Sequence, residues 1–238
     1  MQNIIIASTS TVHGSGYLAY LKERLTSFFS EADTILFIPF ARPGGITHDA
    51  YTQIAAQFFK QIGKQVVGLH EASDTKKAIR EAQAIFTGGG NTFVLVNALY
   101  QTKSMATLRE VILNGTPYLG TSAGSNICGL TMQTTNDMPI TYPPSFKTLG
   151  VIPFNINPHY LDPDPGSTHM GETRETRIKE YHAHNTVPVI GLREGSWLEV
   201  IGESITLHGD QSARLFLSTK EPKEVDANFN FADLAKTF

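Results

Sequence analysis

Cysteine is almost absent from this chain, and long hydrophobic runs are missing altogether. The 238 residues include one cysteine, Cys128, so no internal disulfide can form. A single thiol of this kind suits a reducing compartment. No apolar run approaches the ~20 residues of a membrane span, and the first six residues lack the basic and apolar regions of a signal peptide. We therefore predict a cytoplasmic protein with no membrane partner.

An excess of either charge is also lacking. Nineteen Lys and Arg residues face 22 Asp and Glu residues, which gives a formal net charge of −3. Nucleic acids and anionic membranes attract strongly basic proteins, so we expect neither as a partner. The hydrophobic content of 41% and the charged content of 17% are ordinary for a globular enzyme. Composition carries no information on oligomeric state.

Short strand-like runs alternate with helical patterns through the first half of the chain. The predicted strands are 3–7, 34–38, 65–69, 84–87 and 116–120. The predicted helices are 17–31, 47–62, 74–81, 92–100 and 104–113. Thr47 and Asp74 are expected to cap two of these helices. This alternation predicts an α/β fold, a mostly parallel sheet with helices on both faces.

The last quarter of the chain changes pattern. Four closely spaced strand-like segments follow one another there, at 187–192, 196–201, 204–208 and 213–218. We expect them to form antiparallel C-terminal strands that extend the same sheet. No linker or repeat interrupts the chain, which predicts a single domain over residues 1–238.

Residues 120–124 read Gly-Thr-Ser-Ala-Gly where a buried strand passes into a helix. A G-x-S-x-G turn of this kind lifts the serine hydroxyl above the sheet, and its glycines omit Cβ atoms that the tight turn would exclude. The N–H after the serine then faces the place where an oxyanion would form. Ser122 is a candidate nucleophile, and an ordinary surface serine at a glycine-rich helix start is the alternative.

A serine nucleophile needs a base, and the base needs an acceptor that orients it. Among eight histidines, His159 ends an extended segment in which Pro158 keeps the preceding residue out of the helical region. Glu194 also emerges at a strand end, just before a glycine. The alternatives are a loop histidine bonded to the backbone and a surface glutamate. The order Ser, His, Glu differs from that of α/β-hydrolases, where the acid precedes the histidine.

No motif predicts a cofactor, a nucleotide or a metal. His182 and His184 lie two residues apart, but no third ligand has suitable spacing. The glycine-rich loop 88–91 lacks the Lys-Ser/Thr ending of a phosphate loop and the G-x-G-x-x-G spacing. Beside the Ser122 turn, the same loop can instead present an N–H to an oxyanion.

Seven short motifs, spread over nearly the whole chain, carry one family resemblance. They are residues 37–41, 88–93, 122–124, 134–140, 156–159, 171–175 and 191–195. As an ordered set they resemble the S51 serine peptidases, the peptidase E family. The resemblance implies a fold similar to class I glutamine amidotransferase domains, with a serine in place of the cysteine at the turn.

The resemblance also assigns roles to residues. It implies a triad of Ser122 as nucleophile, His159 as base and Glu194 as third member. It implies an oxyanion hole formed by the N–H groups of Gly90 and Ala123.

The family acts on dipeptides with an amino-terminal aspartate, and its arginine for the aspartyl side chain matches Arg174. Asp137 and Asn91 lie in shared motifs and are further candidates for substrate binding. A guanidinium binds a carboxylate in bidentate fashion. Such a charged hydrogen bond is worth about 1.5–3 kcal/mol, or ~10–100-fold in selectivity.

Two positions depart from the family pattern. Thr121 stands where a bulky aromatic residue is expected, and Ser125 stands where alanine is expected. Both keep the chemistry of the turn, but they leave the shape of the pocket and the substrate range open.

The sequence thus predicts a serine dipeptidase that hydrolyses Asp-Xaa through an acyl-enzyme, with a small aspartyl peptide as its only expected partner. Two alternatives remain open. One is a peptidase similar to cyanophycinase that acts on β-linked aspartyl-arginine, although a larger chain would be expected. The other is a non-catalytic binding domain similar to amidotransferases.

Overall fold

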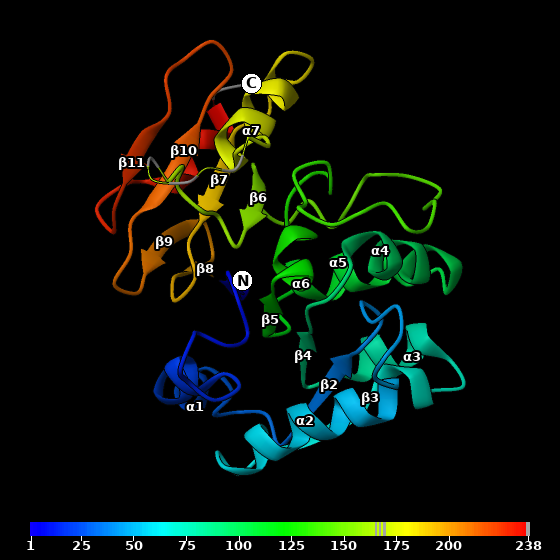
Figure 1. The fold of residues 1–238 in the computed structure, drawn as a ribbon. Coiled ribbons are helices and arrows are strands. Elements are labelled where there is room, and N and C mark those ends of the chain that lie inside the picture. Colours follow the sequence, from blue (N-terminus) through cyan, green and yellow to red (C-terminus); the bar gives the residue numbers. More distant parts are fainter. Residues whose placement is uncertain (165, 167, 169, 237–238) are drawn as a thin grey trace.

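The computed structural model of the chain describes residues 1–164, 166, 168 and 170–236, and within them the strands form two sheets (Figure 1). The larger sheet has the spatial order β3 (Gln65–Gly68), β2 (Thr34–Ile38), β4 (Ala84–Thr87), β5 (Tyr118–Thr121), β1 (Asn3–Ala7), β8 (Trp197–Ile201) and β9 (Ser204–His208). Neighbours among the first five pair in parallel, and β8 and β9 are antiparallel. The predicted α/β architecture is confirmed.

The smaller sheet has the order β11 (Lys223–Val225), β10 (Ala213–Phe216), β7 (Val189–Leu192) and β6 (Asn155–Pro158). The expectation that all the late strands extend one sheet is therefore correct for β8 and β9 and wrong for β7 and β10. Strand β8 occupies the free edge of β1, so β7 cannot pair there. It pairs instead with β6 in parallel and with β10 in antiparallel fashion.

Helices cover the larger sheet on both faces. On one face, α1 (Lys22–Phe28) and α2 (His48–Lys60) pack on Ile5, Phe37, Phe86 and Leu119. On the other face lie α3 (Thr75–Glu81), α4 (Thr92–Gln101), α5 (Met105–Leu113) and α6 (Ala123–Asn126). The smaller sheet shares this second core, and α7 (Arg174–His182) packs on its outer side. One core that joins both sheets supports our proposal of a single domain.

The helix starts follow local chemistry. The Thr47 side chain accepts a hydrogen bond from the N–H of Ala50, and Asp74 accepts from Lys76 and Lys77, so both predicted caps are confirmed. The first predicted helix is shorter than expected. Leu18 adopts a left-handed φ of 53°, a 3-10 turn η1 (Ala19–Leu21) follows, and the α-helix begins only at Lys22.

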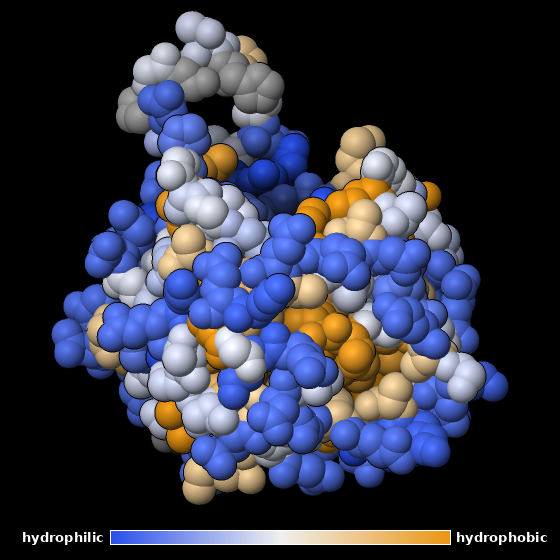
Figure 2. All heavy atoms as spheres, turned by 90° about the horizontal axis from the view of Figure 1, so that it is seen from below, coloured by the Kyte–Doolittle hydropathy of each residue, from blue (hydrophilic) through white to orange (hydrophobic). Residues whose placement is uncertain are grey.

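Two further 3-10 segments complete the fold, η2 (Leu69–Glu71) after β3 and η3 (Phe231–Lys236) at the end of the described chain. None of the helices in the described ranges combines the length and the apolar character needed to cross a membrane. Seen from below Figure 1, the surface is mainly hydrophilic with a few hydrophobic residues gathered near its centre (Figure 2).

Candidate active site

Ser122 lies on a sharp turn between β5 and α6. Its backbone has φ 54° and ψ −111°, a combination that non-glycine residues rarely adopt. The turn is possible because the neighbouring glycines lack side chains. A Cβ on Gly124 would overlap the carbonyl of Thr87, and one on Gly120 would overlap the carbonyl of Gly124. The predicted strand–turn–helix junction is present, with the serine hydroxyl at the carboxyl end of a central strand.

Three side chains form a continuous hydrogen-bonded chain at this point. The Oγ of Ser122 lies 2.8 Å from Nε2 of His159, and Nδ1 of His159 lies 2.6 Å from Oε1 of Glu194. The His159 and Glu194 side chains are 35% and 42% exposed, so a substrate can reach the serine beside them. The structure brings together the three residues that the sequence singled out.

The smaller sheet holds the histidine and the glutamate side by side. Strands β6 and β7 pair in parallel with Pro158 opposite Leu192. His159 is the next residue after the first strand, and Glu194 follows the second by two residues. Because parallel strands end at the same edge of a sheet, both side chains emerge together there.

Ser8 connects the two sheets beside the candidate triad, and the sequence reasoning missed it. Its buried hydroxyl donates to the carbonyl of Leu192 at 2.7 Å and accepts from the N–H of His159 at 2.9 Å. His159 itself has a left-handed φ of 53°. The signal available was the position of Ser8, a small polar residue directly after β1 at the carboxyl edge of the sheet.

The glycine-rich loop 88–91 lies against the nucleophile. A Cβ on Gly89 would lie 2.9 Å from the Cβ of Ser122. Within the described residues, the N–H groups of Gly90 and Ala123 donate to no protein acceptor. Two unused donors beside a serine hydroxyl suit the stabilisation of an oxyanion.

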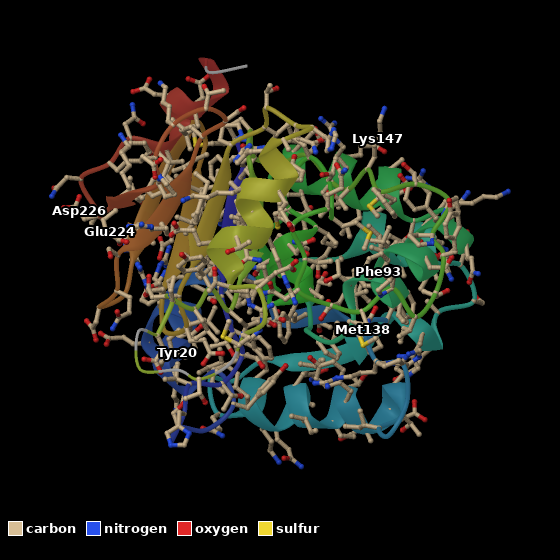
Figure 3. All side chains as sticks on the ribbon, turned by 45° about the horizontal axis from the view of Figure 1, so that its top comes forward. Tyr20, Phe93, Met138, Lys147, Glu224 and Asp226 are labelled. Carbon is tan, nitrogen blue, oxygen red and sulfur yellow. The ribbon has the colours of Figure 1, made fainter. Side chains whose placement is uncertain are left out.

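Tyr20 interacts with Glu194, and Met138 is bonded to Asn91. Burial and the Glu194 carboxylate raise the pKa of Tyr20, whose hydroxyl donates to the carbonyl of Thr9. The carbonyl of Met138 accepts a 2.9 Å hydrogen bond from the side chain of Asn91. In Figure 3 the two labelled residues lie well apart, Tyr20 toward the left and Met138 toward the right.

Comparison with known proteins places the chain in a family. The model of peptidase family S51 matches residues 4–208. The chain belongs to peptidase family S51. It is a serine peptidase, as the sequence motifs predict.

Individual relatives agree with the S51 assignment. Peptidase E of Streptomyces coelicolor is 46% identical over 232 residues, 98% of this chain and 94% of that protein. A Drosophila melanogaster protein named probable alpha-aspartyl dipeptidase is 48% identical over 218 residues, 90% of each chain. The crystal structure of a peptidase from an acI-B1 Actinobacterium has the same fold, with a TM-score of 0.71 at 16% identity over 96% of both chains.

Three further residues of the S51 motifs lie near the start of α4: Asn91, Asp137 and Arg174. Oδ2 of Asp137 accepts hydrogen bonds from the N–H and the hydroxyl of Thr92, both at 2.7 Å. Asn91 caps the same helix through Val94. Burial and Arg177 lower the pKa of Arg174, while the nearby Asp137 carboxylate raises it. Within the described residues no carboxylate oxygen lies within 4.0 Å of the Arg174 guanidinium nitrogens, which leaves a cation available to an anionic ligand.

The two departures from the family pattern are both fully buried. Thr121 and Ser125 have no exposed surface, so neither side chain lines an open pocket directly. The Ser125 hydroxyl lies 2.6 Å from the carbonyl of Ala7 and 2.8 Å from that of Gly120, and so connects α6 to β1 and β5. The Thr121 hydroxyl has no hydrogen-bond partner among the described residues.

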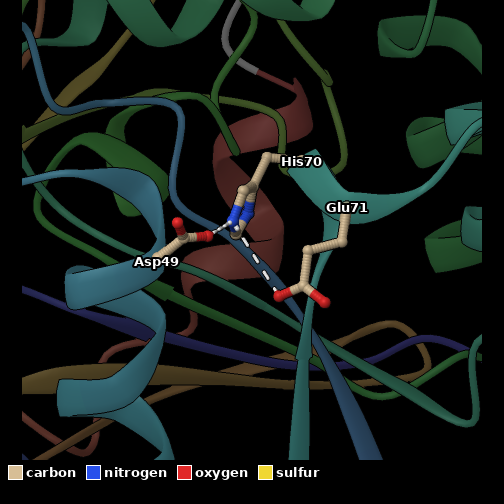
Figure 4. A group of neighbouring side chains, drawn as sticks. All are labelled: Asp49, His70 and Glu71. Carbon is tan, nitrogen blue, oxygen red and sulfur yellow. Dashed lines mark hydrogen bonds and ion pairs between the residues drawn. The ribbon is translucent and has the colours of Figure 1, made fainter.

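One group of side chains away from the triad has the composition of a metal site. Ligand atoms of Asp49, His70 and Glu71 lie within 4.8 Å of one another (Figure 4). Nε2 of His70 is 2.7 Å from Oδ1 of Asp49 and 3.9 Å from Oε1 of Glu71. Both carboxylates are largely exposed, and the group lies beside the edge strand β3, which two strands separate from β5. We interpret it as a surface His–Asp pair.

Proposed function

We propose that the chain is a serine dipeptidase that hydrolyses dipeptides with an amino-terminal L-aspartate, Asp-Xaa. The observation that carries this proposal is the hydrogen-bonded chain from Ser122 through His159 to Glu194. The two relatives above, one named for α-aspartyl dipeptides, support the substrate class.

The reaction is acyl transfer to water. The Oγ of Ser122 attacks the carbonyl carbon of the aspartyl residue while Nε2 of His159 takes the hydroxyl proton. Glu194 accepts a hydrogen bond from Nδ1 and so holds the imidazole in the tautomer that leaves Nε2 free. The N–H groups of Gly90 and Ala123 stabilise the oxyanion.

The tetrahedral intermediate then collapses. The imidazolium of His159 gives its proton to the leaving amine, and Xaa departs as a free amino acid. Water, deprotonated by His159, attacks the ester formed with Ser122 and releases aspartate. In this scheme Arg174 binds the aspartyl side chain, and Asp137 holds the start of α4 and orients the guanidinium by charge.

Substitution of the nucleophile tests the triad. Ser122→Ala should lower kcat on Asp-Leu by about 10⁴-fold or more while the variant still folds and binds substrate. A serine-directed phosphonate should label the unchanged protein and not this variant. Normal turnover by Ser122→Ala would show that the nucleophile is wrong, and absence of labelling would favour a binding domain.

A substrate profile tests the specificity. We expect cleavage of Asp-Leu, with kcat/KM at least ~10-fold lower for Glu-Leu, Asn-Leu and β-Asp-Leu. A guanidinium in a fixed position binds a side-chain carboxylate best at one distance from the scissile bond. Preference for β-Asp-Leu would instead indicate a peptidase similar to cyanophycinase. Arg174→Ala should remove most of the preference for Asp over Asn, whereas an unchanged ratio excludes Arg174 from specificity.

A further inference from the structure

Arg42 is a second unpaired guanidinium beside the candidate oxyanion loop. Five arginines are partly buried, and Arg24, Arg193 and Arg214 all form ion pairs. Arg42 and Arg174 are the other two, and among the described residues no carboxylate oxygen lies within 4.0 Å of the guanidinium nitrogens of either. Its Nε is buried and has no hydrogen-bond partner there.

Aromatic residues hold this guanidinium in place. The Cζ of Arg42 lies 4.3 Å from the centroid of the Tyr51 ring, a cation–π contact. The Tyr17 hydroxyl interacts with both residues: burial, the charge of Tyr51 and a hydrogen bond with it raise the pKa of this hydroxyl, and the Arg42 guanidinium lowers it. The hydroxyls of Tyr17 and Tyr51 are buried, and apart from each other they, like the Arg42 Nε, have no hydrogen-bond partner in the described part of the chain.

A buried guanidinium N–H beside two tyrosine hydroxyls, with no acceptor outside this group, is unusual in a folded protein, because each of these groups has given up hydrogen bonds to water. A guanidinium flanked by two hydroxyls is a set of donors that matches the two oxygens of a carboxylate. The chemistry of the group therefore indicates a carboxylate supplied from outside the chain.

The three glycines of the loop link this group to the nucleophile. A Cβ on Gly88 would overlap the Tyr51 hydroxyl, and a Cβ on Gly89 would lie 2.9 Å from the Ser122 Cβ. A Cβ on Gly90 would overlap the carbonyl of Ala41, the residue before Arg42. Consecutive Cα atoms in the loop are about 3.8 Å apart. The distance from the Arg42 group to Ser122 is therefore on the scale of one or two residues of an extended peptide.

The two partly buried guanidiniums without an ion pair have neighbours on different faces of the larger sheet. Tyr51 packs with Phe37 on the α2 face of the larger sheet. Arg174 interacts with Asp137, which caps α4 on the opposite face. A dipeptide that begins with aspartate carries two carboxylates, one on the side chain and one at its C-terminus, with the scissile bond between them.

We propose that Arg42, together with Tyr17 and Tyr51, binds the C-terminal carboxylate of the substrate and so restricts the enzyme to dipeptides. The inference rests on the proposed function, since it assumes that Asp-Xaa is the substrate and that Arg174 binds the aspartyl side chain. A longer peptide would place an uncharged peptide group opposite Arg42 and leave the donors without their anion.

The test compares Asp-Leu with Asp-Leu amide, which differs only in the C-terminal charge. The unchanged enzyme should prefer the acid by ~10–100-fold in kcat/KM, the range expected for a charge-assisted hydrogen-bonded pair. Arg42→Ala should lower kcat/KM for the acid by that factor and leave the amide unchanged. Arg42→Lys should recover part of the preference, because an ammonium keeps the charge without the planar fork. Arg80→Ala, which removes an exposed guanidinium from α3, is the matched control and should change neither value.

Turnover of the amide reports in every variant whether the triad and the fold are intact. Equal kcat/KM values for acid and amide in the unchanged enzyme would overturn the inference, even if Arg42→Ala failed to fold. An acid-to-amide ratio that Arg42→Ala leaves as it was would overturn it as well. In both cases cleavage of Asp-Leu would leave the proposed function standing. If neither Asp-Leu nor its amide is cleaved, the proposed function itself is wrong and the inference falls with it.

Discussion

Gly90→Ala is the substitution that most directly tests the oxyanion loop. Gly90 has φ +145°, a conformation that residues with a side chain rarely adopt. Its Cβ would also overlap the carbonyl oxygen of Ala41 and lie 2.7 Å from the carbonyl carbon. Carbon atoms pack at about 3.5–4.0 Å, so the loop would have to move by roughly 1 Å. That movement would stretch the 2.7 Å hydrogen bond from the N–H of Asn91 to the same carbonyl.

The expected magnitude follows from these contacts. A side chain in this backbone region costs about 1–3 kcal/mol, and overpacking against backbone costs about 1–3 kcal/mol more. Together these costs are about 2–6 kcal/mol, and for a chain of this size each kcal/mol lowers Tm by about 2–4 °C, so we expect a decrease of roughly 4–24 °C. Displacement of one oxyanion donor should lower kcat by ~10²–10³-fold.

The assay measures Tm by thermal unfolding and kcat on Asp-Leu well below that Tm. Gly63→Ala is the matched control, because Gly63 also has a positive φ, +75°, but a Cβ there meets nothing within 4 Å. The control should lose about 1–2 kcal/mol of stability and no activity. If Gly90→Ala keeps the kcat of the control, Gly90 does not contribute to the oxyanion hole and the reasoning is refuted.

Three further substitutions test the positioning of His159 and the strength of two ion pairs. Ser8→Ala leaves the carbonyl of Leu192 and the N–H of His159 without their buried partner. The substitution should lower the unfolding free energy by about 1–3 kcal/mol and lower kcat at least ~10-fold. Full activity would contradict the role of Ser8 in positioning His159. Burial opposes ionisation of Glu199, but hydrogen bonds from Arg24 and Trp197 outweigh it and lower its pKa, so Arg24→Ala should cost about 2–3 kcal/mol at pH 7. That loss should shrink below about pH 4 as the carboxyl protonates, and a pH-independent loss in urea titrations would argue against it. A hydrogen bond from Arg193, partly opposed by burial, lowers the pKa of Glu224 to about 2. The ionised Glu224 therefore contributes fully to the stability of the fold above about pH 4.5, and this contribution is lost as the pH falls toward about 2. Glu224→Gln should lower Tm at about pH 7, and its Tm should converge with that of the unchanged protein near about pH 2.

Features governed by neighbouring residues were predictable from the sequence. Thr47 and Asp74 cap the expected helices because a side-chain oxygen three residues before a free N–H acts within one turn. The Ser122 turn was predictable for the same reason, since only glycines fit at 120 and 124. His159 and Glu194 were found because both follow strands, and parallel strands bring their ends together.

Features that depend on the choice of strand partner were not predictable. The pattern of β7 fits an extension of the first sheet as well as a second sheet, because hydrophobic periodicity records burial and not the identity of the neighbour. Only the occupation of the β1 edge by β8 decides between them. Arg42 carried no sequence signal either, since its importance lies in the absence of a partner in space.

The proposed triad is partly exposed, and the division into two sheets bears on how its three side chains are held in position. Ser122 belongs to the larger sheet, whereas His159 and Glu194 belong to the smaller one. A misplacement of about 1 Å between reacting groups can cost ~10²-fold in rate, so the sheets must be fixed relative to each other. Two contacts contribute to this: the apolar core shared by the sheets, and the hydroxyl of Ser8, which follows β1 of the larger sheet and bonds to Leu192 and His159 at the ends of β7 and β6. The geometry of the proposed triad is therefore a property of the junction between the sheets, and we expect that a residue remote from the substrate can control activity by moving one sheet against the other.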